Sequence, residues 1–174
     1  LTRYEHGEFF SQDSIKQDES HIYYASIGRP VYGGGGIMPD YFVPLDTLKY
    51  TKYHRALAAK GSITQASLKY LDSNRAQLTK EYSDIYDFEN RFEVDETFLN
   101  ILREQSILDK VELEGGEEEY NKSLTEIKKQ LKNLIARDIW DMEQFIEIYN
   151  RSNDMFLKAY ELVKEKKFEK LMQK

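Results

Sequence analysis

The chain has 174 residues, of which 40% are hydrophobic and 32% are charged, and its formal net charge at pH 7 is −6. This length can hold one domain with a core of useful size, or one domain and a fragment of another. The lack of a large basic stripe argues against nucleic acid as the main partner, and the lack of cysteine excludes disulfides, thiolate metal sites and a cysteine nucleophile.

Residues 1–45 are predicted to be irregular or extended. Leu1–His6 suit the last turn of a helix, with Gly7 at the position of a left-handed C-cap, and residues 8–20 suit an irregular connection. Three short runs have strand composition: 21–27, 29–32 and 41–43.

The segment Gly28–Pro44 differs in composition from the rest of the chain. It holds all three prolines and five of the nine glycines. The four consecutive glycines Gly33–Gly36 can adopt positive φ and allow another backbone to approach closely. We therefore expect a tight connection here, placed before a long helical region.

A helical period begins at residue 46. Asp46 or Thr47 is the predicted cap of a first helix, which Gly61 ends, and Ser62 is the predicted cap of the next helix. A short aromatic-rich helix with Ile85, Tyr86 and Phe88 is predicted within Tyr82–Phe92. Asp95 is a predicted cap for another helix, which carries Phe98, Leu99 and Leu102.

The clearest helix follows Gly115 and Gly116. Its apolar residues fall on one helical face and are Tyr120, Leu124, Ile127, Leu131, Leu134 and Ile135. The residues Glu117–Glu119 lie in its first turn, as the helix dipole prefers. Ser152 or Asn153 can cap a last helix, and the lysine-rich tail 164–174 is expected to fray. The predicted fold class is mainly α, with a small β-containing region at residues 1–45 and an α-helical domain at 46–174.

No residue pattern indicates a metal or cofactor site. His6, His21 and His54 lie far apart in three kinds of segment, without the spacing that metal ligands need. In Glu112–Glu119 the two glycines lie together and Glu117–Glu119 follow them as a block, without the alternation of a calcium loop, which favours a solvated helix start. The glycine run Gly33–Gly36 lacks the lysine and the following helix of a phosphate-binding loop.

Ser67 is the candidate serine nucleophile of the sequence. The stretch from Gly61 to Ser67 resembles a serine-enzyme motif, but Ser67 falls in the middle of a predicted helix, with no base clearly placed beside it. A serine hydroxyl is a weak nucleophile without such a base. The prediction is therefore no catalytic, cofactor-binding or metal-binding residue in this chain, with a small hydrolase using Ser67 kept as an alternative.

The segment Gly28–Asp40 resembles the C-terminal processing peptidases, also called tail-specific proteases. In that family a Gly-Ile-x-Pro-Asp element, matched here by Gly36–Asp40, closes the catalytic core after the active-site residues. The four glycines with Val-Tyr before them are similar to envelope members from Bacteroidetes-type bacteria. Arg3–Glu8 and Leu134–Trp140 also fit that subgroup, so the resemblance spans most of the chain.

The resemblance implies a serine peptidase that cleaves proteins near their C-termini in the periplasm or cell envelope. The family uses a serine nucleophile with a lysine base, usually beside a PDZ domain that recognises substrate C-termini. Both catalytic motifs precede the Gly-Ile-x-Pro-Asp element and neither is found here. The chain, which opens without an initiator methionine, is therefore expected to start inside a longer protein. It would be inactive alone and would supply the end of the peptidase core (1–45) and a helical C-terminal domain (46–174).

The expected partners follow from this interpretation. They are the peptidase core and PDZ domain of the same protein, the protein substrates of the parent enzyme and a second copy of the chain. The helical domain would pack on the core, gate substrate access or mediate assembly. No run approaches the roughly 18 apolar residues that span a bilayer, so no membrane span is predicted. The alternative function is an independent α-helical interaction module unrelated to proteolysis.

Overall fold

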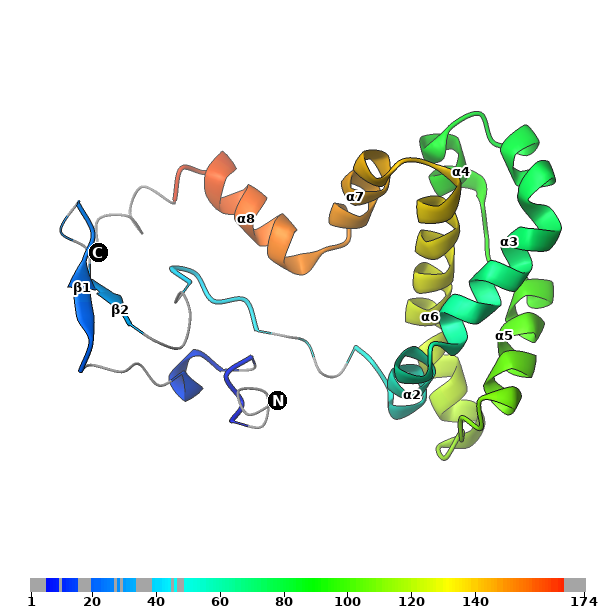
Figure 1. The fold of residues 1–174 in the computed structure, drawn as a ribbon, viewed down its shortest axis with the longest axis horizontal. Coiled ribbons are helices and arrows are strands. Elements are labelled where there is room, and N and C mark those ends of the chain that lie inside the picture. Colours follow the sequence, from blue (N-terminus) through cyan, green and yellow to red (C-terminus); the bar gives the residue numbers. More distant parts are fainter. Residues whose placement is uncertain are drawn as a thin grey trace. The chain divides into compact units, whose positions relative to one another are not determined.

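The computed structural model describes residues 6–9, 11–15, 20–26, 28, 30–33, 39–44, 46 and 49–167. Within these residues the chain is mainly helical and carries one small two-stranded sheet, which confirms the predicted mainly α class (Figure 1). The chain forms two compact units. Unit 1 comprises Leu1–Thr47 with Asn153–Lys174, and unit 2 comprises Leu48–Ser152.

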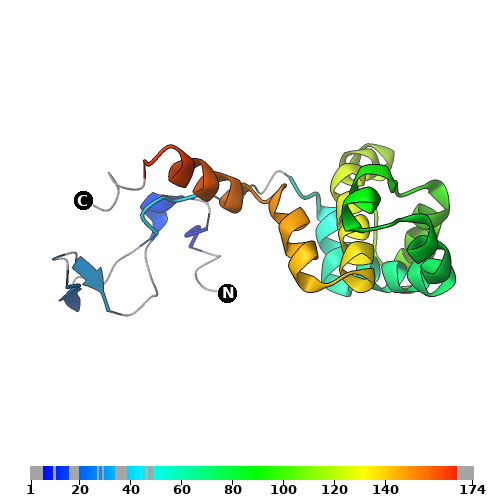
Figure 2. The same cartoon turned by 90° about the horizontal axis from the view of Figure 1, so that it is seen from above.

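Unit 2 is a bundle of helices. Their bounds are α2 Lys52–Lys60, α3 Ser62–Glu81, α4 Ile85–Arg91, α5 Glu96–Leu108, α6 Gly116–Ile139 and α7 Met142–Asn150. Helix α3 packs against α5 and α6, α2 packs against α3 and α6, and α7 packs against α4 and α6. Figure 2 shows these helices gathered in one bundle. The long helices α3 and α6 thus connect the other elements of the bundle.

The first helix of the bundle begins later than the sequence predicts. Asp46 is not helical and Thr47 lies outside the described residues, whereas the cap is Thr51, whose Oγ1 accepts from the backbone N–H of His54 at 3.1 Å. The Thr51 hydroxyl also hydrogen-bonds Oγ of Ser123 on α6 at 2.6 Å. This tertiary bond fixes the helix start and has no trace in the local sequence.

The second predicted cap, Ser62, is wrong. Gly61 ends α2 as predicted, in the left-handed region with φ 76°, and the same residue precedes α3. Ser62 is the first residue of α3 and not its cap, since its buried Oγ donates to Oδ2 of Asp109 at 2.6 Å. The predicted caps Asp95 and Asn153 are confirmed, because each side chain accepts from backbone N–H groups of the helix that follows.

All the buried apolar side chains of the described residues belong to unit 2. The core includes the fully buried Leu57, Ile63, Leu71, Ile85, Phe88, Phe98, Ile127, Leu131 and Ile135. The predicted apolar face of α6 supplies three of these side chains. Aromatic rings extend the core, for example Tyr70, which stacks on Phe98 with ring centroids 4.0 Å apart. Each fully buried large apolar side chain contributes roughly 1.5–3 kcal/mol, so this core accounts for the order of the bundle.

Unit 1 contains a β-hairpin of strands β1 Ile22–Tyr24 and β2 Pro30–Tyr32. The strands are antiparallel, and Tyr23 pairs with Val31. The N–H of Gly33 donates to the carbonyl of His21 at 2.7 Å, and a Cβ at Gly33 would lie 2.9 Å from the Tyr23 ring. This is the close approach expected of the glycine run, of which 34–36 lie outside the described residues.

Two other predictions for this region have different outcomes. The predicted strand 41–43 is wrong, because this segment is irregular and pairs with no strand in the part of the chain that the structure describes. Pro44 after it lacks a backbone N–H for a strand ladder. Gly7 has the predicted positive φ, 77°, while the helix turn expected before it falls on residues outside the description.

Unit 1 also contains a short 3-10 helix, η1 Gln12–Ser14, and helix α8, Asp154–Lys164. Lys158 lies on the partly covered side of α8, with its Nζ 5.2 Å from the centre of the Tyr41 ring. None of the described residues of unit 1 is buried. Across the described residues of both units, no helix is both long and apolar enough to cross a bilayer.

We expect Phe98→Ala to lower the free energy of unfolding of unit 2 by about 3–5 kcal/mol, because it leaves a cavity in a fully packed site. Urea unfolding followed by circular dichroism measures the change, and Phe98→Leu gives a milder variant if the alanine form does not fold. The control Ile107→Ala, at a side chain that is 71% exposed, should change the value by less than about 0.5 kcal/mol. Equal effects of Phe98→Ala and Ile107→Ala would contradict this account of the core.

Candidate functional site

Ser67 is placed where it cannot act as an activated nucleophile. It lies within α3, is 1% exposed, and its Oγ donates to the carbonyl of Thr64 at 2.8 Å. Among the described residues no histidine, lysine or carboxylate bonds this hydroxyl. The geometry therefore gives no support to a hydrolase that uses Ser67.

The three histidines do not converge on one site. His54 lies in α2, His21 precedes β1 and hydrogen-bonds Ser20 at 2.8 Å, and His6 lies in a turn. In the described part of the chain no group of three or more histidine and carboxylate side chains could hold a metal ion. The three histidines thus have separate local roles.

In the acidic stretch before and within α6, the carboxylate of Glu119 binds two backbone N–H groups. Glu119 accepts from the backbone N–H of Tyr53 at 2.9 Å and from that of Gly115 at 3.0 Å. The first bond satisfies an N–H at the start of α2, which has no partner inside its own helix. These N–H donors, that of Tyr53 foremost, hold the pKa of Glu119 below its ordinary value of 4.5. Glu119 therefore joins the start of α2 to the start of α6.

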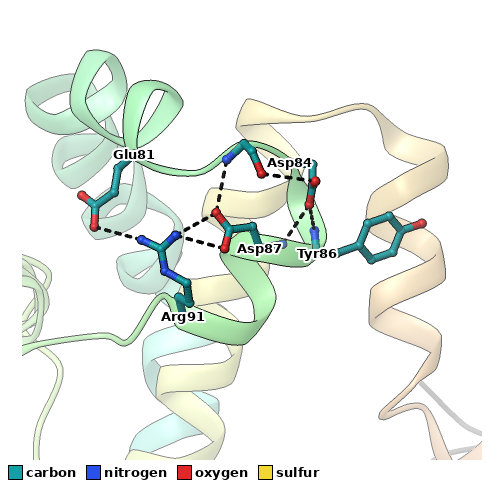
Figure 3. A network of polar contacts seen from close by, with 6 residues as sticks. Glu81, Asp84, Tyr86, Asp87 and Arg91 are labelled. Atoms are coloured by element: carbon teal, nitrogen blue, oxygen red, sulfur yellow. Dashed lines mark hydrogen bonds and ion pairs between the residues drawn. The ribbon is translucent and has the colours of Figure 1, made fainter.

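A second polar network closes the end of α3 onto α4 (Figure 3). Oδ1 of Asp84 caps α4 by accepting from the N–H groups of Tyr86 and Asp87 at 2.9 and 2.8 Å. Figure 3 shows the Arg91 guanidinium between Asp87, at 2.9 Å, and Glu81, at 3.9 Å. The contacts of this network are helix-cap hydrogen bonds and surface ion pairs. The network therefore orders the turn and offers no reactive group.

Lys132 on α6 is the lysine whose environment most resembles that of a catalytic base. Burial lowers the pKa of its ammonium group. However, Nζ donates to two carbonyl oxygens at the end of α4, those of Glu89 and Phe92, each at 2.6 Å. Both bonds satisfy carbonyls that a helix end leaves without partners. Lys132 is thus engaged in tying α4 to α6.

Exposed apolar side chains occur in both units, and in unit 1 they gather on two surfaces. The first is the hairpin surface, which we define as Ile22, Tyr23, Tyr24 and Val31, with exposed fractions from 40 to 72%. Successive side chains of a strand point to opposite faces, so both faces of the hairpin are exposed. An isolated two-stranded hairpin is marginally stable at best in water, and this one needs a neighbour.

The second surface is the α8 face, which we define as Met155, Phe156, Tyr160 and Val163. These side chains are 45 to 62% exposed, and no residue of α8 is buried. Residues 156, 160 and 163 lie four and three apart, so they share one side of the helix. An amphipathic helix normally buries its apolar side. The spacing of this face is readable in the sequence, but its exposure is visible only in the structure.

Residues 53–141 match the model of a protein family described as "Family of unknown function (DUF8443)". The match covers just over half of the chain, and the chain belongs to this family. The matched residues lie wholly inside unit 2 and run from α2 to the cap of α7. No curated protein and no solved structure matches the chain.

We expect Glu119→Gln to weaken the acid dependence of stability. Because the folded-state pKa of Glu119 is lowered, the unfolded state binds the extra proton. The contribution of Glu119 is therefore complete above about pH 5 and is lost as the pH falls below 4.5 through the folded-state pKa. Urea midpoints measured between about pH 3 and 6 should fall less steeply for Glu119→Gln than for the natural chain.

The matched control for this measurement is Glu117→Gln, at an exposed carboxylate in the same first turn of α6. It should leave the slope of the natural chain unchanged. The same slope for Glu119→Gln and the natural chain would show that the carboxylate does not join the two helix starts.

Proposed function

We propose that this chain is the C-terminal region of a serine-type carboxy-terminal processing peptidase of the periplasm or cell envelope. In this proposal unit 2 is a non-catalytic helical domain, and unit 1 belongs to the surface that packs on the catalytic core. The parent enzyme would cleave proteins near their C-termini, with its serine and lysine residues upstream. The chain by itself would have no peptidase activity.

The observation that carries the proposal is the absence of buried residues in the described part of unit 1. Residues that bury no side chain gain little to offset the conformational entropy that folding costs, roughly 1–2 kcal/mol per residue for the backbone alone. The hairpin surface and the α8 face both need an apolar partner. Strand β2 of the hairpin falls in the segment Gly28–Asp40, whose last residues, Gly36–Asp40, resemble the closing element of the peptidase core.

The placement of the reactive side chains supports the same proposal. Ser67 is buried without a base, and Lys132 is held by two carbonyl oxygens. Neither residue forms part of a serine–lysine pair, which agrees with catalytic residues supplied by another part of the protein. The polar networks around Glu119 and Arg91 serve to order helices, as expected of a supporting domain.

Co-expression tests the proposal directly. The 174-residue chain is produced with an affinity tag beside the polypeptide encoded upstream of it in the same gene. We expect the upstream polypeptide to be recovered in equal amount, and the complex to cleave an unfolded protein substrate in a way that a fluorophosphonate probe blocks. The chain alone should neither cleave the substrate nor react with the probe. Cleavage by the chain alone that Ser67→Ala abolishes would contradict the proposal, as would an upstream sequence without serine and lysine motifs.

The uncovered surfaces provide a second measurement. Tyr24→Lys in the hairpin surface and Phe156→Lys in the α8 face should each reduce recovery of the upstream polypeptide by about tenfold or more, since each loses an apolar contact of roughly 1.5–3 kcal/mol. The matched control is Leu108→Lys, at a side chain of unit 2 that is 67% exposed, and it should recover the natural amount. Equal recovery for all three variants would show that the two surfaces are not the contact.

One observation favours a second function, an independent α-helical interaction module. The family match covers residues 53–141 and excludes the segment Gly28–Asp40, while Leu134–Trp140, which also fit the peptidase subgroup, lie inside it. This range holds most of the apolar core, so it forms a structural unit of its own. An upstream sequence without peptidase motifs, together with a full-length protein that lacks peptidase activity, would favour the module.

A further inference from the structure

Unit 2 contains a cavity of about 480 Å³ lined by the residues before α2, by α2 itself, by α6 and by α7. Its apolar lining comes from Tyr50, Ala58, Leu134, Phe145 and Tyr149. Aromatic and aliphatic walls with a few polar groups, in a volume of roughly 300–1,000 Å³, are typical of small-molecule sites. None of the structural networks described above uses this cavity.

The rim of the cavity carries an excess of positive charge. Lys49 and Lys129 both lie near the same carboxylate, Glu126, at 3.9 and 2.9 Å. Arg55 adds a third cation to the lining and brings no carboxylate with it. The local excess is positive in a chain whose net charge is −6, so the rim differs in sign from the molecule as a whole.

Arg55 stands apart from the other arginines of the described residues. Its guanidinium has no hydrogen-bond or ion-pair partner there, whereas each of the others bonds an oxygen atom of the protein. These others are Arg75, Arg91, Arg103, Arg137 and Arg151. A planar guanidinium presents a fork of donors that matches a carboxylate. Arg55 thus offers an unused anion-binding group at the edge of an aromatic cavity.

His54 lines the same cavity and is 3% exposed. Its Nε2 lies 2.7 Å from Oε1 of Gln130, and because an amide oxygen only accepts, Nε2 is the donor. Nδ1 is buried and has no hydrogen-bond partner in the described structure. Unsatisfied buried polar atoms are rare in folded proteins and call for an explanation, such as a water molecule or an ion at the site.

We propose that this cavity binds a small organic anion, with a flat apolar body between Tyr50, Phe145 and Tyr149 and a carboxylate on Arg55. Lys129 adds a second positive charge within the same lining. A charge-assisted, two-point bond to the guanidinium fixes the orientation of the ligand, and the aromatic walls bury its body. This site lies within unit 2 and does not depend on the peptidase assignment.

The test uses a pair of probes of the same shape and different charge, 1-naphthoate and the neutral 1-naphthamide. Isothermal titration of the 174-residue chain should show one site for naphthoate, with naphthamide about tenfold weaker or undetected, because an ionic hydrogen bond is lost. Naphthoate should also shift the ring signals of His54 in the NMR spectrum. Equal affinity for the two probes would overturn the carboxylate assignment.

Matched variants locate the site. Arg55→Ala should weaken naphthoate about tenfold and leave naphthamide unchanged. Ala58→Phe, which fills the cavity from an exposed position of α2, should abolish binding of naphthoate. The control Ala59→Phe adds the same ring at the next position, which is also exposed and does not line the cavity, and it should bind naphthoate normally.

Folding of each variant is checked from its urea midpoint before titration. Natural affinity in Arg55→Ala and Ala58→Phe would overturn the proposal. So would naphthoate-induced NMR shifts confined to the α8 face or the hairpin surface. No binding of naphthoate by the natural chain at millimolar concentration would overturn the proposal as well.

Discussion

The buried apolar stripe of α6 is the constraint on which the other helices of unit 2 depend. Ile127, Leu131 and Ile135 are each 0% exposed, and α2, α3 and α7 all pack against this helix. The polar ties follow from that packing, because burial brings helix ends beside α6. Glu119 then meets the start of α2 and Lys132 meets the end of α4. Both side chains satisfy backbone groups that would otherwise lack partners.

The two units differ in how far their apolar side chains are buried. Unit 2 encloses its core, while the described residues of unit 1 leave the hairpin surface and the α8 face in contact with solvent. The hydrophobic effect acts on both units alike, so the exposed surfaces of unit 1 call for a partner. This contrast is the physical reason to treat unit 1 as an interaction surface. Residues 28–40, which resemble a peptidase segment, belong to the same unit, so both observations support the proposed role of the chain.

Much of the helical pattern was predictable from local rules. The face of α6, the caps Asp95 and Asn153 and the stop at Gly61 depend on residues close in sequence, and all are confirmed. The predicted caps Asp46 and Ser62 failed because distant residues decided them. Ser123 supports Thr51, and Asp109 binds Ser62. The strand expected at 41–43 failed for a related reason, since a strand exists only where another strand pairs with it.

The sequence by itself determined the mainly α class, the position of the longest helix and the lack of any cysteine chemistry, because these follow from composition and from the 3.6-residue period. Only the tertiary structure decided which apolar faces are covered and which cationic side chains keep a partner. The exposure of the α8 face and the unpaired guanidinium of Arg55 both depend on what other segments bring near them. Such neighbours come from residues far apart in the chain, and no local pattern encodes them.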